Sequence, residues 1–489
     1  LLPRQGRTNG LQFTPDEAET QQAGGTFTDV FDADGWASGL PWLWWLLWLE
    51  VAAVATVPWV TWLFRALPAR GYGLSKLLGL ASVALPTWML VAWGAAQFSG
   101  SLVWAVFASV LVLGVTTGMF RLASLREDAR AHWRSWLAAD AVFVVAFFAF
   151  LLIRAYNPDL WHHPQGGEKP MEIAYLTAVT RSTIMPPYDP WFAGGSLNYY
   201  YMGWFFLAVP IRALKIVPEV AFNLGVPTYA ALASTVAFTV VQSLVGMSAR
   251  VRDATPAAAR RPAILAGIAG AVLLIGIANL DGAHQWIERL QAANTWGAGE
   301  GVPVIGGAVG IFGGLWAWLI EGAALRPFDW WRSSRVHFGT IDITEFPYWS
   351  MLFADLHPHL MGLPFFGSVV ALVVAYAASV RGRLRAQTWV LAVVLGLAVG
   401  LVRTVHTWDF PTAVLIAGVG IPLGQLLRAE GRWQDRFWNG VAHLAIAGVV
   451  ASVAFSPYTS HFETFDPGVR RAVATTKAHQ FFVHFGVYI

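Results

Sequence analysis

Two polar stretches of this sequence place carboxylates, imidazoles and a lysine at spacings that suit acid–base or metal chemistry. In the first stretch, Glu168, Lys169 and Glu172 lie close together in the chain. Residues four positions apart share one helix face, and a carboxylate near a helix N-terminus is stabilised as an anion. Such a carboxylate can act as a general base or bind a metal ion. A solvated helix start would contain the same residues, so this alternative stays open.

The second stretch runs Asp355-Leu-His357-Pro-His359. Its oxygen and nitrogen ligands, closely spaced, suit a divalent ion, and Asp355 is a second candidate base. Hydrogen bonding to a phosphate is another use for these groups, and a network that caps a helix at the membrane interface is the plain alternative. Further charged or polar candidates for substrate binding lie before and after this stretch: Arg335, Glu345, His406 and Asp409.

A segment rich in proline and glycine precedes three consecutive tyrosines. Asp189, Trp191 and Asn198 lie in this segment, where proline and glycine favour an ordered turn. The tyrosines Tyr199–Tyr201 would point in different directions on a helix, so at least one hydroxyl should face protein or ligand. An aromatic anchor at the membrane interface is the alternative.

The composition is that of a membrane protein. Of the 489 residues, 56% are hydrophobic and only 12% are charged, about half the charged fraction of soluble domains. The chain has no cysteine, which excludes disulfides and thiolate metal sites. No run combines clustered basic residues with stacking aromatics, so we expect no nucleic-acid partner.

Apolar segments long enough to cross a bilayer predict an all-α, polytopic transmembrane helical bundle of about ten spans. Two shorter apolar stretches, 199–214 and 302–320, are expected to form interfacial or re-entrant helices in two long outer loops. The predicted spans cover residues 39–64, 77–98, 101–120, 137–156, 219–247, 262–280, 360–380, 387–404, 412–427 and 440–457.

Basic residues predict the orientation of these spans. Arginine and lysine cluster in alternate loops, at 65–76, 121–134, 250–261, 381–385 and 428–436. Because basic loops favour the cytoplasm, the other face should be extracytoplasmic. The N-terminal segment and the long loops 157–218 and 281–359 then lie outside, and Arg212 and Lys215 would meet lipid head groups. The chain ends where an apolar stretch begins, so we expect an excerpt that is truncated at its C-terminus.

Three groups of residues resemble a known family. They are the segments 166–175 and 189–201, and Thr344–Pro347 with Phe353–His359. These segments resemble the YYY-motif membrane protein family of bacteria and archaea, which has no settled activity. That family is similar to the GT-C superfamily of polyprenyl-phosphate-sugar-dependent glycosyltransferases. The likeness covers almost the whole chain, and its tyrosine triplet is its most specific part.

The resemblance implies roles for several residues. Met171-Glu172-Ile-Ala-Tyr175 looks like the acidic motif of GT-C enzymes with its first acid missing, which makes Glu172 the match for the catalytic carboxylate. The missing acid leaves open whether a divalent cation, Mg²⁺ or Mn²⁺, is needed. The implied domains are an extracytoplasmic segment 1–38, a three-span addition 39–136 and a GT-C-like membrane core 137–489.

The function implied is sugar transfer from a polyprenyl-phosphate donor to an acceptor at the extracytoplasmic face of a prokaryotic cell membrane. The partners expected are membrane lipid and the lipid-linked sugar. The alternative is a non-catalytic subunit of a membrane complex, or a lipid-handling or transport protein. The whole hypothesis requires Glu172 and Asp355–His359 to meet in one outward-opening site. Catalytic candidates are Glu172, Glu168 and Asp355; substrate-binding candidates are Lys169, Asp189, Trp191, Asn198, Tyr199, Tyr200, Tyr201, Arg335, Glu345, His406 and Asp409; metal candidates are Asp355, His357 and His359.

Overall fold

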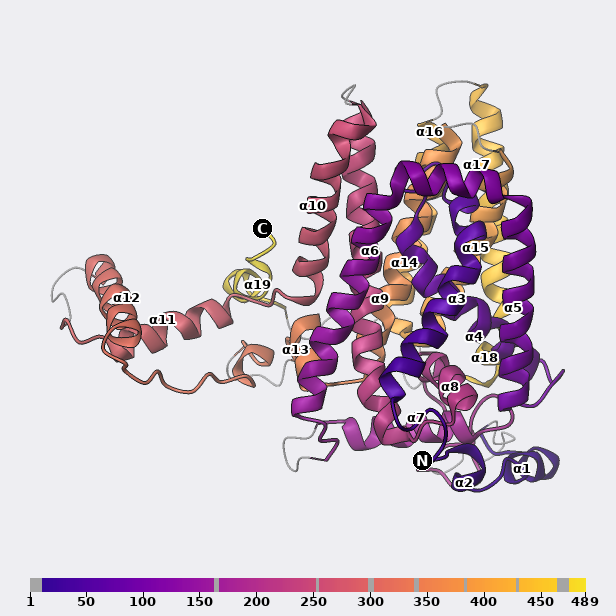
Figure 1. The fold of residues 1–489 in the computed structure, drawn as a ribbon, viewed down its shortest axis with the longest axis horizontal. Helices are drawn as coiled ribbons and strands as arrows, with labels where there is room; N and C mark the ends of the chain where they lie inside the picture. The colour runs from indigo at the N-terminus through magenta and orange to yellow at the C-terminus, as the bar shows by residue number, and fades with distance from the viewer. Residues whose placement is uncertain are drawn as a thin grey trace. The chain divides into compact units, whose positions relative to one another are not determined.

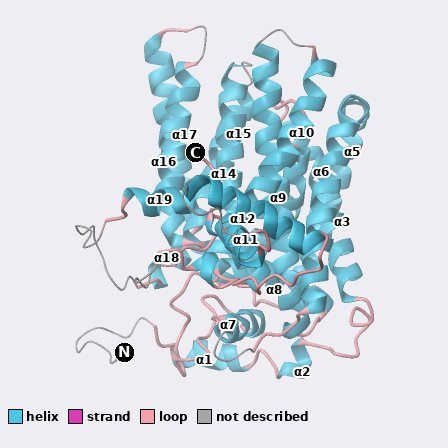
Figure 2. Cartoon of the chain, turned by 90° about the vertical axis from the view of Figure 1, so that its left-hand side faces the viewer, coloured by secondary structure: helices cyan, strands magenta, loops and turns pink. Residues whose placement is uncertain are grey.

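The computed structural model of the protein is helical throughout the part of the chain that it describes (Figure 2). That part covers residues 11–161, 167–251, 255–297, 303–337, 343–381, 385–427, 431–463 and 475–489. Two compact units emerge. The first combines Leu1–Ile275 with Ala354–Phe465, and the second combines Gly276–Phe353 with Asp466–Ile489. The boundaries 1–38, 39–136 and 137–489 stay a prediction.

Ten helices among the described residues are long and apolar enough to span a membrane, which confirms the predicted all-α polytopic fold. The largest difference is α6, which begins at residue 122 rather than 137. Residues 122–136 are polar or charged in large part, and the segment contains no proline or glycine. It therefore continues the helix. The spanning helices are α3 (Pro41–Leu63), α4 (Ser75–Ala92, preceded by η1, Tyr72–Leu74), α5 (Gly100–Phe120), α6 (Leu122–Tyr156), α9 (Pro218–Val251), α10 (Pro256–Ile275), α14 (Pro358–Arg381), α15 (Arg385–Val405), α16 (Phe410–Leu426) and α17 (Trp433–Ala454).

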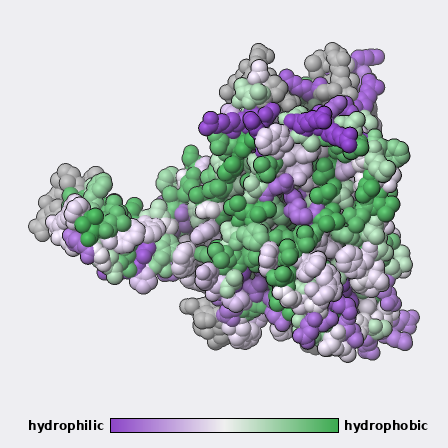
Figure 3. All heavy atoms as spheres, in the orientation of Figure 1, coloured by the Kyte–Doolittle hydropathy of each residue, from purple (hydrophilic) through white to green (hydrophobic). Residues whose placement is uncertain are grey.

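The two ends of the first unit differ in what they carry. The ends of α10 and α17 that follow predicted basic loops lie at the top in Figure 1, whereas α7 (Lys169–Arg181) and α1 (Pro15–Gln22) lie at the opposite end. A broad hydrophobic belt separates these ends (Figure 3). Residues 252–254, 382–384 and 428–430 of the basic loops lie outside the described part. The alternation of basic and non-basic ends follows the prediction, while the compartment that each end faces stays a prediction.

The short apolar stretch after the tyrosines forms α8 (Met202–Leu214), which is too short to cross a bilayer. Every residue of α8 except Arg212 is buried, so the helix packs inside the bundle rather than on lipid. Arg212, for which the sequence suggested contact with lipid head groups, has partners within the protein. Its guanidinium donates hydrogen bonds to the carbonyls of Thr180, Arg181 and Ser182, at 2.6, 3.1 and 3.3 Å. It therefore caps the C-terminus of α7 and ties α8 to that helix. Lys215, after the end of α8, is exposed.

The N-terminal segment holds the loop between α7 and α8 in place. This segment contains α1 and α2 (Phe27–Val30). Backbone hydrogen bonds join Phe13 to Gly194 at 3.0 Å and Ser196 to Leu11 at 2.6 Å. The Thr183 N–H donates to the Gln21 side chain at 2.8 Å. The loop that leads to the tyrosines is therefore fixed by its contacts with the N-terminal segment.

The second unit is built from α11 (Asp281–Ala293), α12 (Pro303–Leu319), η2 (Arg332–Ser334), α13 (Pro347–Phe353) and α19 (Ala478–Phe485). The α11 and α12 helices pack closely: a Cβ at Gly314 would lie 1.7 Å from the Leu290 carbonyl oxygen. Arg332 forms ion pairs with Asp281 at 2.8 Å and Glu288 at 2.7 Å, which fixes η2 to α11. With its 17 residues, α12 falls just short of the usual spanning length. An interfacial or re-entrant place for it stays a prediction.

In the first unit, the remaining short helices are η3 (Thr407–Asp409), which joins α15 to α16, and α18 (Ser456–His461), which follows α17. Both contribute side chains near the tyrosine triplet. The fold therefore places α7, the tyrosines and the starts or ends of several spanning helices at one end of the first unit.

Candidate functional site

The candidate site is built around the first turn of α7. Glu168 is the N-cap residue of this helix and Pro170 lies in its first positions, where proline is favoured because its missing N–H needs no partner. One turn later, Glu172 is fully buried, with 0% of its surface exposed. The Glu168 side chain is 60% exposed. Two carboxylates of one helix face thus have opposite environments, one open and one enclosed.

His357 joins these two carboxylates to the turn before α14. Its Nδ1 atom lies 2.8 Å from a Glu168 carboxylate oxygen and 3.2 Å from a Glu172 carboxylate oxygen. The Leu356 backbone N–H donates to the other Glu172 oxygen at 2.9 Å. The expectation that Glu172 meets the Asp355–His359 stretch is therefore confirmed, although the two segments lie far apart in the chain.

The buried carboxyls of Glu172 and Asp355 form a pair. They hydrogen-bond to each other, which requires a proton on one of them. Burial raises the pKa of Glu172 to about 7, against the hydrogen bonds from Asp355 and Leu356. Burial and the neighbouring Glu172 charge together raise the pKa of Asp355 well above its usual value. A proton shared by this pair is thus available near neutral pH.

The charges around this pair differ in accessibility. Burial lowers the pKa of Lys169, whose side chain faces the charges of Asp355 and Glu172. The hydrogen bond with His357 lowers the pKa of Glu168, so this exposed carboxylate stays ionised at neutral pH. His359, in the first turn of α14, lies 3.9 Å from an Asp355 oxygen. The site therefore combines an accessible anion with a buried cation.

A row of rings leads away from His357 through Tyr199 and Tyr200 to His406, and we call it the ladder. The Nε2 atom of His357 lies 3.1 Å from the Tyr199 hydroxyl. The rings of Tyr199 and Tyr200 are 4.2 Å apart, and the Tyr200 ring lies 6.1 Å from that of His406. His406 in turn lies 2.9 Å from an Asp409 oxygen. The predicted candidates Tyr199, Tyr200, His406 and Asp409 are thus contiguous with the carboxylates of α7.

A glycine allows the last part of this ladder to form. A Cβ at Gly362 of α14 would lie 3.2 Å from the Cβ of His406 and 3.3 Å from an Asp409 oxygen. A side chain at position 362 would push the His406–Asp409 pair away from α14. The close approach of this helix backbone therefore helps to position the pair.

Other predicted residues have structural contacts instead. Tyr201 lies outside the ladder: it is 2% exposed and its hydroxyl accepts a hydrogen bond from the Trp88 indole at 3.2 Å. The Asn198 amide exchanges two hydrogen bonds of 2.9 Å with the backbone of Glu463. The tyrosines precede α8 rather than lie on it, which corrects the helical placement. None of these contacts tests the substrate role that the sequence suggested.

The loop before the tyrosines shows the same pattern. The Asp189 carboxylate accepts the backbone N–H groups of Trp191 at 2.7 Å and Phe192 at 3.3 Å, which holds a tight turn. The Trp191 ring is 65% exposed. Asp189 therefore shapes the loop, and Trp191 presents a large apolar surface at its tip.

Arg335 and Glu345 belong to the second unit and pair with each other there. The Arg335 guanidinium lies 3.3 Å from a Glu345 oxygen and stacks over the Trp331 ring at 4.7 Å. Their substrate-binding role stays a prediction.

The residues of the first unit include a set that fits a divalent cation. One ligand atom each from Glu172, Asp355 and His357 lie within 4.8 Å of one another. This set shares Asp355 and His357 with the predicted metal ligands, and contains Glu172 in place of His359. Two carboxylate oxygens and one imidazole nitrogen are suitable ligands for Mn²⁺ or Mg²⁺.

Two aromatic residues of the site, Tyr175 and Trp204, were not among the predicted site residues, although the acidic motif included Tyr175. The Tyr175 ring lies 5.6 Å from the Tyr199 ring, and the Trp204 ring lies 5.3 Å from Tyr175 and 5.9 Å from Tyr199. Through these two rings, Tyr199 packs against α7 and α8. Tyr175 follows Glu172 by three positions, so the helix-face rule that paired Glu168 with Glu172 also indicates Tyr175. No comparable signal marks Trp204.

In chemical terms, the site offers an exposed carboxylate held by an imidazole, a proton-sharing carboxyl pair and a tyrosine hydroxyl. This combination suits proton transfer from a polar substrate. Comparison with known proteins limits what can be concluded about its use. No curated protein and no solved structure matches the chain.

One family model matches, over residues 82–489. Its description is "Uncharacterized membrane protein", and the match includes α7, the tyrosine triplet and the Asp355–His359 stretch. The match covers most of the chain and begins within the second predicted span. The chain belongs to this family, DUF2298, and is an integral, multi-pass membrane protein.

Proposed function

We propose that the protein transfers a sugar from a polyprenyl-phosphate donor to an acceptor hydroxyl at the end of the bundle that carries α7. The observation that supports this most is the contact of His357 with two carboxylates, one exposed and one buried. An exposed carboxylate that is ionised at neutral pH and held in a fixed position can accept the proton of a hydroxyl group. The resemblance to GT-C enzymes supplies the donor class.

In the proposed reaction, Glu168 is the base. Its carboxylate takes the proton of the acceptor hydroxyl while the acceptor oxygen forms a bond to the anomeric carbon. The bond between that carbon and the phosphate oxygen breaks, and polyprenyl phosphate leaves with the bonding electrons. A single displacement without a covalent intermediate inverts the anomeric configuration, by the logic of inverting glycosidases.

The other residues of the site hold His357 in position or offset the negative charge of the leaving phosphate. Glu172 is fully buried and therefore out of contact with an acceptor, so we assign it to holding His357, with Asp355 hydrogen-bonded to Glu172. Tyr199 contacts His357 from the other ring nitrogen. Lys169 supplies a buried positive charge that favours the departing phosphate, since buried charges are screened less by salt. A divalent ion bound by Glu172, Asp355 and His357 would add positive charge for the same purpose.

Proteoliposomes that contain the purified protein and a panel of polyprenyl-phosphate sugars test the proposal, with a membrane extract as acceptor and mass spectrometry of the carrier as readout. We expect wild-type protein to release polyprenyl phosphate and the Glu168→Gln variant to do so at least about 100-fold more slowly. Glu219→Gln, which changes an exposed carboxylate at the start of α9, should retain full activity. Equal rates for wild type and Glu168→Gln would refute the assignment of the base.

A further inference from the structure

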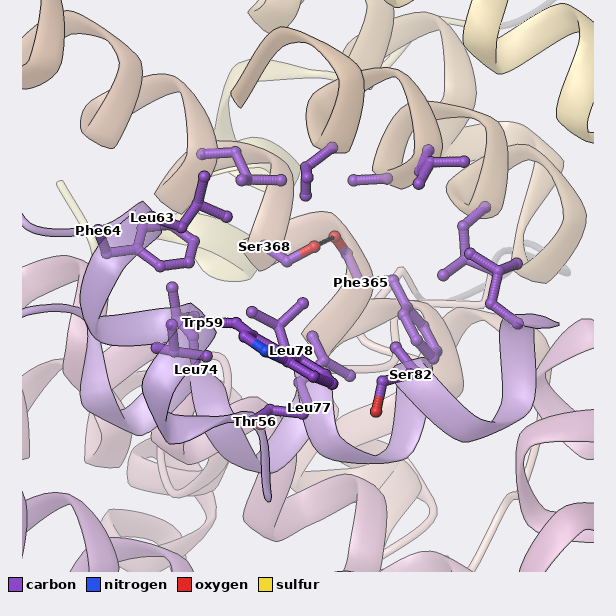
Figure 4. A pocket seen from close by; sticks show the side chains of 18 of the residues that line it. Thr56, Trp59, Leu63, Phe64, Leu74, Leu77, Leu78, Ser82, Phe365 and Ser368 are labelled. Carbon is purple, nitrogen blue, oxygen red and sulfur yellow. Dashed lines mark hydrogen bonds between the residues drawn. The ribbon is translucent and has the colours of Figure 1, made fainter. Parts of the chain in front are cut away.

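A cavity of about 320 Å³ lies between two pairs of spanning helices in the first unit. α3 and α4 form one wall, and α14 and α15 form the other. Figure 4 shows Trp59, Leu63, Leu77 and Leu78 on one side and Phe365 with Ser368 on the other. The cavity is only partly enclosed. It is thus an open hollow within the membrane-spanning part of the protein.

The lining offers almost no polar group to a ligand. The hydroxyls of Thr56, Ser82 and Ser368 donate to backbone carbonyls of their own helices, at 2.8, 2.8 and 2.6 Å. The Trp59 indole N–H donates to Thr117 of α5, at 3.1 Å. Water needs two or more polar partners to occupy a cavity, and apolar cavities stay dry and take apolar ligands. The hollow therefore suits hydrocarbon.

Two of the helices that line the cavity also lead to residues of the candidate site. Phe365 lies eight positions after His357, which is about 12 Å along α14. Leu401 of α15 lies five positions before His406, or about 8 Å. A chain that occupies the cavity can therefore place a polar head group near His357 and His406.

The size of the cavity favours one chain. A cavity of about 150 Å³ holds a benzene ring, so this one has room for roughly twice as many carbons. A lipid with a single chain can place part of that chain here, whereas a two-chain phospholipid would leave its second chain outside.

We propose that this cavity binds the isoprenoid chain of a polyprenyl phosphate, with the phosphate directed to the Glu168–His357 site. The inference rests on the proposed function for the identity of the lipid. It adds the place where the carrier chain lies, between α3/α4 and α14/α15.

Lipid retention tests this without any measurement of transfer. Purified protein in detergent is incubated with polyprenyl phosphate and an excess of phospholipid, and bound lipid is identified by native mass spectrometry. We expect retained polyprenyl phosphate in wild type and at least about tenfold less in Ala81→Trp and Ala398→Trp, whose new side chains fill the cavity. The control Val112→Trp changes a residue of α5 that is 64% exposed and should retain the lipid.

A second measurement uses unaltered protein, in case a filled variant does not fold. A photoreactive isoprenoid phosphate should cross-link to peptides that contain Leu78 or Phe365. Cross-links confined to the exposed face of α5, equal retention in filled and control variants, or phospholipid as the retained species would each overturn the proposal. Retention of polyprenyl phosphate without any sugar transfer would contradict the proposed function alone.

Discussion

The Nδ1 atom of His357 lies 2.8 Å from the exposed carboxylate of Glu168, although 189 positions separate the two residues in the chain. The same nitrogen lies 3.2 Å from the buried carboxylate of Glu172. α7 and the turn before α14 are therefore joined through one imidazole. The predictions below test the consequences of this contact.

Glu172 should make thermal stability depend on pH. Its pKa is about 7 in the folded protein and near 4.5 in an unfolded chain, so the folded state binds more protons between these values. Stability from this group is present below about pH 4.5 and is lost as the pH rises through about 7. We expect wild-type protein in detergent to melt at a lower temperature at pH 8 than at pH 5.

The Glu172→Gln variant should show a smaller difference between these two pH values, because an amide can accept the Leu356 N–H without titrating. A fluorescence-monitored melting series checks this, with Glu219→Gln as the control. An unchanged pH dependence in Glu172→Gln would argue against a raised pKa at this position.

Tyr199 and Tyr201 offer a matched pair. Each phenylalanine variant loses one hydrogen bond, to His357 or to Trp88, and each should lose about 1 kcal/mol of stability. Only Tyr199→Phe should slow sugar transfer, because only Tyr199 contacts the imidazole that holds Glu168. Equal transfer rates in the two variants would remove the positioning role of Tyr199.

The absence of cysteine makes the orientation directly testable. Trp191→Cys places a thiol at an exposed position on the α7 side, and Trp433→Cys places one at an exposed position beside the basic turn before α17. A membrane-impermeant maleimide added to intact cells should label the first and not the second. Labelling of position 433 alone would reverse the proposed orientation.

The cation set should bind Mn²⁺ in competition with protons. Because the carboxyl pair of Glu172 and Asp355 shares a proton, bound Mn²⁺ must displace it, and affinity should weaken as the pH falls below about 7. Electron paramagnetic resonance of free Mn²⁺ measures the binding. Unaltered affinity in Asp355→Asn would place any bound ion elsewhere.

The spans were accessible from sequence because each depends on local hydropathy and length. All ten predicted segments coincide with helices. The α6 boundary was missed because a polar helix that continues an apolar one leaves no hydropathic signal. The packing of α8 was missed in part, since the same apolar residues suit lipid or a protein interior. Arg212 is an example: its guanidinium donates hydrogen bonds to three carbonyls at the end of α7, and no local sequence pattern predicts these partners.

The residue types of the site could be predicted from the sequence, but the environment of each residue could not. Glu168 and Glu172 look equivalent on a helix face, yet tertiary packing exposes one and buries the other. The hydrogen bonds of Asn198 to the backbone of Glu463 depend on a contact across 265 positions. Such partners follow from the folded arrangement of several helices, which hydropathy does not encode.

A double-mutant cycle on sugar transfer tests most directly whether Glu168 and His357 act as one unit. Rates are compared for wild type, Glu168→Gln, His357→Gln and the double variant in the same proteoliposomes. We predict that each single change slows transfer at least about 100-fold and that the double variant is no slower than the slower single variant. Effects that multiply in the double variant, or single variants as fast as wild type, would contradict the account.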